Sequence, residues 1–588
     1  MIRRLAGAAI VALILLVSGC ASLPTSSAPQ ALGTVAREPA VPELPVPTPG
    51  REPQLLVRDF VKASTDPTDG HAAARQFLTD DASKGWNDGA SATVVDKVDV
   101  LEDSRSGDSA EYTIRANRVG QLEQGGQYQA EEGSFEARLT LSRTDGEWRV
   151  DGLPAGTIMD RTQFLNSYER KSLYFADPTG ASLVPDPRWV SVAQDRLAEQ
   201  LMGSLVSGPR DSLAPAVRNL LNGVSLRGPV TKADGRTSSV GVGLGGIRVD
   251  LTGLGNLDTA NRELLAAQVI WTLAEAEVSG PYVILSDGVP LDSAYPDGWT
   301  TAEVASYDPL SVSGATIGLH ALKGGSLVKI GDDASVTPVP GYFGTVNNLK
   351  SISLSADGTL VGAVSDTGRA APQLPDALFI GTYGSGAFPV AEGNSVTRPS
   401  WGPDKDAVWA VVDGTRVVRA VRDPATGQVS VVGVDSSELA GIGGQISELR
   451  LSRDGVRAAL IVDGSVYVAV VVRQSNGVYA LREPRPVADG LGSSALSLDW
   501  STGDTVVVAR ASSDVPIVQV AVDGSRLDAL PSRNLTAPVV SVDASATSVF
   551  VADSRAVFEI DNTDPASDRY WREVPGLTGT SAVPVLPG

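Results

Sequence analysis

The sequence predicts a multidomain protein that combines an α+β cone, an α/β domain and an all-β propeller of five or six blades. Three observations predict this fold class. The hydrophobic spacing changes from helical to alternating within residues 51–156, and the two spacings are mixed within 170–290. A corner sequence then recurs at nearly regular intervals within 300–588. At ~100–200 residues per domain, a chain of 588 residues accommodates three such units.

The chain begins with a segment typical of a leader peptide, expected over residues 1–19. Arg3 and Arg4 precede about a dozen apolar residues, fewer than the ~20 that a membrane-spanning helix needs. Small residues then lead to Cys20, the only cysteine in the chain. This order resembles the processing site of bacterial lipoproteins. The resemblance implies cleavage before Cys20, an S-diacylglycerol and an N-acyl group on Cys20, and anchoring at the outer face of the cytoplasmic membrane. An uncleaved anchor with an incidental thiol is the alternative.

Residues 20–50 are expected to form a tether between the lipid and the folded body. Prolines at 24, 29, 39, 42, 45, 47 and 49 preclude a packed element and favour extended polyproline II. The tether would span roughly 30 Å as a flexible coil and about 90 Å when fully extended.

The first folded unit is expected over residues 51–156. Leu56, Phe60 and their neighbours follow helical spacing after Pro53, and a second helix is expected around 71–78. Alternation then begins at Tyr112 and lapses at Asn117, and Asp145-Gly146 predicts a hairpin turn. Helices followed by an antiparallel sheet resemble the α+β cone of the nuclear transport factor 2 superfamily. Such a cone either holds a ligand pocket or is filled by its own side chains.

The second unit is expected over residues 170–290. Strands are predicted at 173–175 and 183–185, a helix through Leu197, Leu201 and Leu205, a strand over 247–251, and a helix through Leu265, Val269 and Leu273. The ordered set, from Tyr174-Phe175 to Asp287-Gly288, is similar to the GerMN domain of spore-germination and cell-envelope proteins. The resemblance implies a non-catalytic module that binds a partner protein or the wall.

The third unit, over residues 300–588, is predicted to be a β-propeller. The corner positions Ser355, Pro403, Ser452, Ser501 and Ala544 are separated by 48, 49, 49 and 43 residues, and short strands surround each of them. This period is typical of propeller blades, since a lone four-stranded sheet cannot bury both of its faces. The motifs account for five blades and the length leaves room for a sixth. A nonspecific β-sandwich would not explain the regular spacing.

Composition and motifs argue against several classes of activity. A net charge of −21 disfavours nucleic-acid binding, which needs a basic surface. His71 and His320, the only histidines, fall in different predicted domains, which disfavours a His-based triad or a multi-His metal centre. The string Gly241–Gly246 matches a dinucleotide-binding pattern, but strand alternation follows it where a helix is required. We therefore expect no cofactor, no metal site and no catalytic residue.

Three groups of acidic residues could be imagined as sites. Asp80-Asp81 and Glu131-Glu132 are adjacent pairs, which are usually solvated turn or strand residues. Asp561, Asp564 and Asp568 lack the glycine and the terminal glutamate of an EF-hand, so a plain loop is the better interpretation.

Taken whole, the order of leader, tether, cone, GerMN-like domain and propeller resembles the LpqB family of actinobacterial lipoproteins. That resemblance implies a non-enzymatic accessory protein. Its implied partner is the extracytoplasmic domain of a sensor histidine kinase of the MtrAB type, in a system that governs cell-wall homeostasis and cell division. A binder of cell-wall glycan or peptidoglycan is the alternative, with Trp401 and Trp500 as conceivable stacking surfaces for sugars.

Overall fold

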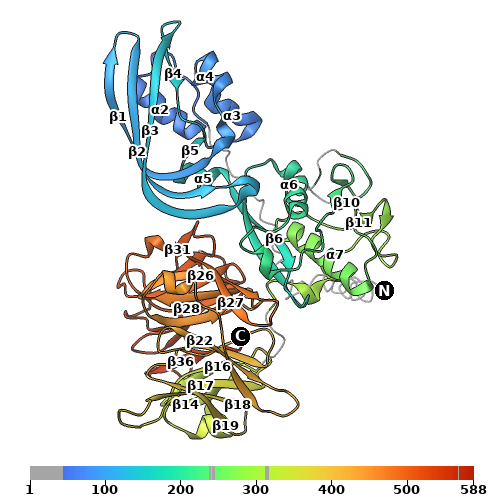
Figure 1. Cartoon of the computed structure of the whole chain (residues 1–588), viewed down its shortest axis with the longest axis vertical. Coiled ribbons are helices and arrows are strands. Elements are labelled where there is room, and N and C mark those ends of the chain that lie inside the picture. The colour runs from blue at the N-terminus through green and yellow to red at the C-terminus, as the bar shows by residue number, and fades with distance from the viewer. Residues whose placement is uncertain (1–43, 238–239, 241–244, 312–316, 567, 580) are drawn as a thin grey trace, which may run out of the picture. The chain divides into compact units, whose positions relative to one another are not determined.

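In the computed structural model, which describes residues 44–237, 240, 245–311, 317–566, 568–579 and 581–588, the first domain packs helices against a five-stranded sheet. The sheet has the strand order β4-β3-β2-β1-β5. Figure 1 shows helices α2, α3 and α4 beside this sheet. The bounds are α2 Pro53–Ala63, α3 Thr68–Arg75, α4 Asp80–Gly85, β1 Ala92–Ser106, β2 Ser109–Leu122, β3 Tyr128–Thr144, β4 Glu147–Gly152, β5 Thr157–Asp160 and α5 Arg161–Ser167.

The first helix forms as predicted, whereas the second begins and ends earlier than expected. Pro53 occupies the first turn of α2, and Leu56 and Phe60 are buried against the sheet. The expected helix over 71–78 is α3, Thr68–Arg75, and its residues 69–71 have positive φ. Leu78 lies outside the helix and instead makes a β-bridge to Val150 at the edge of the sheet.

The long strands follow the predicted alternation, with Tyr112 and Ile114 buried on the helix-covered face. The lapse at Asn117-Arg118 corresponds to register shifts between Val94 and Val95 and between Arg118 and Gly120. Such bulges bend a strand, which curves the sheet. Past the expected boundary at residue 156, β5 extends the sheet by pairing in parallel with β1.

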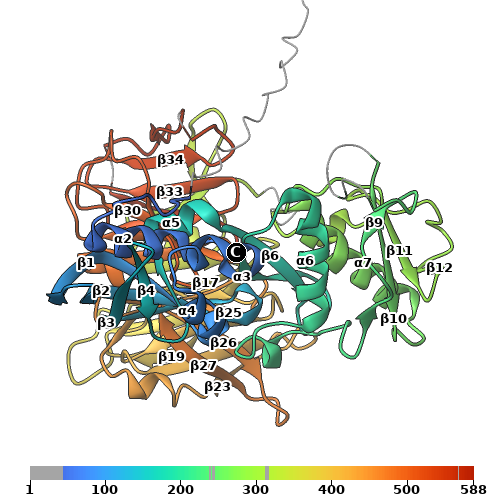
Figure 2. The same ribbon diagram turned by 90° about the horizontal axis from the view of Figure 1, so that it is seen from above.

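The GerMN-like domain contains a long hairpin and a small mixed sheet joined by two helices. The hairpin strands are β6 Glu169–Ala176 and β7 Leu183–Val190, and the sheet runs β12-β11-β10-β8 with β9 also paired to β10. Figure 2 shows α6 and α7 beside this sheet. The remaining bounds are α6 Gln194–Ser207, α7 Thr259–Ala274, β8 Ser225–Leu226, β9 Thr231–Lys232, β10 Ile247–Thr252, β11 Tyr282–Ser286 and β12 Val289–Pro290.

Both helices of this domain match their predicted faces. Leu197, Leu201 and Leu205 of α6 are buried, and the helix ends at Gly208, whose φ of 99° favours glycine. Helix α7 packs on β6 and is buried along most of its length, which fixes the hairpin on the body of the domain.

The third domain is a propeller of six four-stranded sheets, so the sixth blade that the length allowed is present. Each predicted corner lies at the end of the first strand of a blade or just after it: β16 Leu349–Leu354, β20 Ser400–Trp401, β24 Ile446–Leu451, β28 Ala495–Thr502 and β32 Ser541–Ala544. The other strands are β13 His320–Lys323, β14 Ser326–Ile330, β15 Val336–Pro338, β17 Leu360–Asp366, β18 Asp376–Thr382, β19 Ala387–Gly393, β21 Ala407–Val412, β22 Arg416–Arg422, β23 Val429–Gly433, β25 Arg457–Val462, β26 Ser465–Arg473, β27 Tyr479–Pro486, β29 Thr505–Arg510, β30 Ile517–Ala521, β31 Leu527–Ala529, β33 Ser548–Ala552, β34 Val557–Asp561, β35 Arg572–Glu573 and β36 Ala582–Val585.

Two features close the ring of blades. Strand β36, near the C-terminus, pairs with β13 and completes the first blade. One buried apolar cluster lies between each pair of neighbouring blades, as in the cluster that joins Ile461 of the fourth blade to Trp500 of the fifth. Burial between blades therefore supplies the second face that a single sheet lacks.

Candidate functional site at the domain junction

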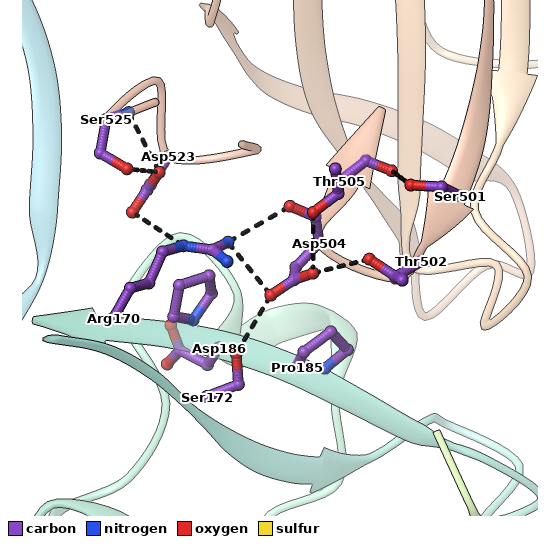
Figure 3. Close-up of polar contacts among 12 residues, drawn as sticks. Arg170, Ser172, Pro185, Asp186, Ser501, Thr502, Asp504, Thr505, Asp523 and Ser525 are labelled. Atoms are coloured by element: carbon purple, nitrogen blue, oxygen red, sulfur yellow. Dashed lines mark hydrogen bonds and ion pairs between the residues drawn. The ribbon is translucent and has the colours of Figure 1, made fainter. Parts of the chain in front are cut away.

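A largely buried, charged contact between domains is made by Arg170 of β6 with the propeller. Its Nη2 atom lies 3.1 Å from Oδ2 of Asp504 and donates a hydrogen bond of 3.2 Å to the Asp504 carbonyl. Its Nε atom lies 3.6 Å from Oδ2 of Asp523. Figure 3 shows the guanidinium between these two acids. Burial disfavours the charge of Arg170, but the two carboxylates outweigh it and raise the arginine's pKa.

Asp504 is held in place from both sides of the junction. Ser172 of the hairpin donates to its Oδ2 at 3.1 Å, and Thr502 of the blade corner donates to its Oδ1 at 2.8 Å. Burial works against ionisation, but Arg170 and these hydroxyls together lower the pKa of Asp504. Asp504 is therefore a charged, fully engaged contact rather than a free carboxylate.

The blade corner also fits closely against β7. A Cβ atom at Gly503 would lie 2.9 Å from Cδ of Pro185, so only glycine fits this approach without displacement. Beside it, Arg457 donates to the carbonyl oxygens of Pro185 at 2.7 Å and Gly503 at 3.2 Å. Burial lowers the pKa of Arg457 and raises that of its neighbour Asp454.

All three domains meet around Trp189 at the end of β7. Its Nε1 atom donates to Oδ2 of Asp523 in the propeller at 3.2 Å, and its ring lies 4.7 Å from that of Phe164 in the first domain. Gly524, next to Asp523, lies so close to Ala130 of the first domain that a Cβ atom there would approach Ala130 Cβ to 2.6 Å. One propeller turn thus contacts both other domains.

A second buried charge cluster lies among the inner strands of the propeller. Arg398 lies 2.8 Å from Glu448 and 3.5 Å from Asp543, and Arg450 lies 3.0 Å from Asp499. Asp499 and Asp543 are also close enough to influence each other's ionisation. Burial and the neighbouring Asp499 raise the pKa of Asp543 well above its usual range. Asp499 keeps a lowered pKa because Arg450 and Arg398 outweigh its burial.

The pKa values of Asp499 and Asp543 are shifted in opposite directions, as in a catalytic acid–base pair. The surroundings of the two carboxyl groups are nevertheless those of a structural pair. Asp543 accepts a hydrogen bond from the Leu586 backbone at 3.2 Å, and Asp499 accepts one from the Ala544 backbone at 2.9 Å. Both residues are buried, and their oxygens face arginines and backbone amides. The arrangement holds the inner strands together.

The residues singled out in the sequence do not assemble into one site. Cys20 and positions 241–244 lie outside the described residues. Strand β10 follows Gly246, as the alternation predicted, and the dinucleotide pattern lacks the helix it requires. His71 lies beside Trp86 in the first domain, and His320 contacts Gly318 and Tyr383 in the propeller.

The acidic groups of the sequence are accounted for by local contacts. Asp80 and Asp81 occupy the first turn of α4, where negative charge is stabilising. Glu131 pairs with Arg118 at 2.6 Å. Asp561 caps a turn at Thr563 and Asp564 pairs with Arg572 at 2.8 Å. Within the described ranges, no cluster of three or more His, Cys, Asp or Glu side chains is arranged to hold a metal ion.

Trp401 and Trp500 offer no exposed surface for stacking on a sugar, and side chains fill the helix-covered face of the first domain's sheet. Trp401 and Trp500 are each 2% exposed and donate their indole N–H to the carbonyl oxygens of Ser353 and Arg450. The helix-covered face of the first domain's sheet is filled by a cluster that includes Phe60, Tyr112, Leu139 and Trp148. The two tryptophans are core residues.

The junction residues were not predicted as a site. Asp504 lies three residues after the predicted corner position Ser501, and Asp523-Gly524 is a typical turn dipeptide. Their partner Arg170 is 334 residues from Asp504 in sequence. No local signal connects residues at that separation.

Comparisons with known proteins match each of the three domains. The family described as "Lipoprotein LpqB, N-terminal domain" matches residues 46–165, "Sporulation and spore germination" matches 172–292, and "Lipoprotein LpqB beta-propeller domain" matches 325–587. Within the described residues, the helices are too short or too polar to span a membrane.

Full-length relatives extend the match over the whole chain. The chain is 64% identical to a protein named Lipoprotein LpqB of Rhodococcus opacus, covering 100% of this chain and 98% of the relative. It is 51% identical to the protein of that name in Nocardia farcinica, covering 99% and 98%, and 46% identical to that of Mycobacterium tuberculosis, covering 97% of both.

Proposed function

Because the chain belongs to the LpqB lipoprotein family, we propose that it is a membrane-tethered accessory protein that regulates a sensor histidine kinase of the MtrAB type. In this proposal the lipid on Cys20 holds the folded domains at the outer face of the cytoplasmic membrane. The kinase's extracytoplasmic domain is the partner, and the protein catalyses no reaction of its own. Cell-wall homeostasis and division are the processes affected.

The observation that carries this proposal is that the charged side chains at the domain boundaries are bound to one another. Arg170, Asp504 and Asp523 bind the GerMN-like domain to the propeller, and Trp189 adds the first domain to the same turn. Breaking a buried ion pair is strongly destabilising, so these contacts hold the domains together as one body that can present a shared surface to a partner. Such an arrangement suits a binding protein. The ionisable groups of the junction are paired with one another, so they are not available as acids or bases.

The anchor supports the proposal through effective concentration. A tether that spans roughly 30 Å as a coil confines the body to a thin layer above the membrane. A weak contact with a membrane receptor in that layer then behaves as an intramolecular one. Two acyl groups or more are needed for stable retention, which the expected modification of Cys20 supplies.

Copurification tests the proposed partner directly. Full-length lipidated protein in nanodiscs is mixed with the purified extracytoplasmic domain of the kinase at tens of micromolar, with empty nanodiscs as the blank. We expect a complex of the two proteins. The absence of any complex under these conditions contradicts a direct partnership.

Binding to wall glycan remains the second candidate, but the burial of Trp401 and Trp500 removes its proposed stacking surfaces. A parallel retention assay on purified peptidoglycan separates the two functions. Retention on the wall without kinase binding favours the glycan function, and the reverse favours the kinase function.

A further inference from the structure

A cavity of about 320 Å³ lies between the GerMN-like hairpin and the blade corners of the propeller. This volume is at the lower end of the range for small-molecule sites, which occur preferentially between domains. The groups that matter for its chemistry are Tyr174, Ser182, Glu275, Asp308 and Arg453.

Two neutral hydroxyl groups on the cavity wall lack partners. Tyr174 is 5% exposed, and its hydroxyl forms no hydrogen bond within the described parts of the chain. Its backbone is fixed by a bond from its N–H to Thr272 and one to its carbonyl from Gln268. The Oγ atom of Ser182 is buried and also lacks a partner. An unpaired buried polar group is costly, so the Ser182 hydroxyl calls for a binding partner, and the Tyr174 hydroxyl on the same wall is free to bond one.

Three charged side chains on the wall, Glu275, Asp308 and Arg453, have no ion-pair partner among the described residues. Glu275, which is exposed, and Asp308, which accepts a hydrogen bond from the Leu310 N–H at 2.8 Å, have no cation within ion-pair distance among the described residues. Partial burial together with Asp308 raises the pKa of Glu275. On the propeller side, Arg453 donates to the Ala544 carbonyl at 3.2 Å but faces no carboxylate in the described ranges. By contrast, Asp504 on the same wall is taken up by Arg170.

We propose that this cavity binds a small zwitterion, namely an amino acid or a short peptide with a free ammonium and a free carboxylate group. The ammonium group would lie at Glu275 and Asp308, and the carboxylate at Arg453, whose planar guanidinium suits that geometry. The hydroxyls of Tyr174 and Ser182 would bond the remaining polar atoms. This inference stands whether or not the protein meets a kinase.

Other ligand classes leave part of the wall unsatisfied. A phosphate-bearing ligand would be repelled by Glu275 and Asp308, and a metal cation would be repelled by Arg453. A neutral sugar would bury these charges without pairing them, which is unfavourable. A ligand with both charges compensates both ends of the cavity.

Calorimetric titration of the full-length protein in nanodiscs tests the ligand class. The probes are D-alanine, L-lysine and the dipeptide D-alanyl-D-alanine, which separate a free amino acid from a peptide source. N-acetyl-D-alanine lacks the ammonium group and D-alaninamide lacks the carboxylate, so each tests one end of the site. We expect at least one zwitterionic probe to bind and both singly charged analogues to bind at least about tenfold more weakly.

Three variants locate the site. We expect Glu275→Gln and Arg453→Gln each to weaken binding about tenfold, and Tyr174→Phe about threefold, since charged hydrogen bonds are stronger than neutral ones. The matched controls are Glu277→Gln and Arg416→Gln, exposed residues that do not line the cavity. They should bind as the wild type does.

Three results overturn the proposal. Equal binding of either singly charged analogue contradicts the zwitterion class. Unchanged binding in all three variants contradicts the location of the site. The absence of heat with every probe at about 10 mM, a concentration that saturates a millimolar site, contradicts the binding of a zwitterion.

Discussion

At the scale of single residues, the two coupled acids inside the propeller differ in what they do. Asp499 is charged and compensates Arg450, with which it pairs at 3.0 Å. Asp543 has its pKa raised well above the usual range by burial and by Asp499, so it is the acid of the pair that takes up a proton first. An amide can replace a protonated carboxyl group but cannot replace a carboxylate.

We therefore expect opposite outcomes from two isosteric substitutions. Asp543→Asn should change the free energy of unfolding by less than about 1 kcal/mol, because asparagine keeps a neutral donor and acceptor there. Asp499→Asn should cost about 3 kcal/mol, because it leaves Arg450 buried without its counter-ion. Chemical denaturation of both variants measures the difference. Equal losses in the two would contradict the assignment of the proton to Asp543.

Asp504 predicts a pH dependence of the domain junction. Its pKa is lowered in the folded protein, so its contribution to stability is present above the unfolded value of ~3.9 and is lost as the pH falls through the folded value. The difference in melting temperature between wild type and Asp504→Asn should stay constant from neutral pH to about pH 5 and shrink below about pH 4. A difference that instead grows on acidification would show that the sign is wrong.

At the scale of elements, the approach of a blade corner to β7 depends on one glycine. A Cβ atom at Gly503 would lie 2.9 Å from Pro185 and 3.1 Å from Asp454. We expect Gly503→Ala to destabilise the protein by about 1–3 kcal/mol, since crowding at a packed contact displaces both partners. Gly133→Ala in β3, with open space around it, is the control. Thermal unfolding of the two variants measures the effect, and equal melting temperatures would contradict the tight fit.

Elements were predictable where a local pattern determines them. Alternation placed Tyr112 and Ile114 on the buried face, and the repeated corner placed the inner strands of five blades. The repeated corner did not reveal the first blade, because the inner strand of that blade, β36, comes from residues 582–585 at the far end of the domain. Helix α3 was misplaced because residues 69–71 have positive φ, which helical spacing of apolar residues does not reveal.

At the scale of the whole molecule, the contacts at the domain junction could not be predicted from the sequence. Arg170 stands at the expected start of the second unit, before the strand predicted at 173–175, and Asp504 stands beside a predicted corner. Contact between them depends on how two folded domains dock. Hydrophobic periodicity reports which face of an element is buried, not which domain covers it. The expected lipid site at Cys20 rests on the sequence and the family.

The lipid anchor leads to a prediction about signalling. Cys20→Ala should leave the fold and melting temperature of the mature domains unchanged, because the tether separates them from Cys20, and should lower kinase output through lost localisation. A reporter of the response regulator in cells, together with fractionation, measures both. Full complementation by a released, unlipidated protein would mean that anchoring has no part in the function.

The central claim, that the body contacts a sensor kinase at the membrane, is tested most directly by photo-crosslinking in living cells. A photoreactive residue is placed singly at exposed positions of the full-length chain: Phe388 in the propeller, 68% exposed, and Val289 in the GerMN-like domain, 64% exposed. Substitution at such exposed sites should leave the fold intact. The account predicts a covalent adduct with the kinase from at least one domain. Adducts from both domains that never contain the kinase would contradict it.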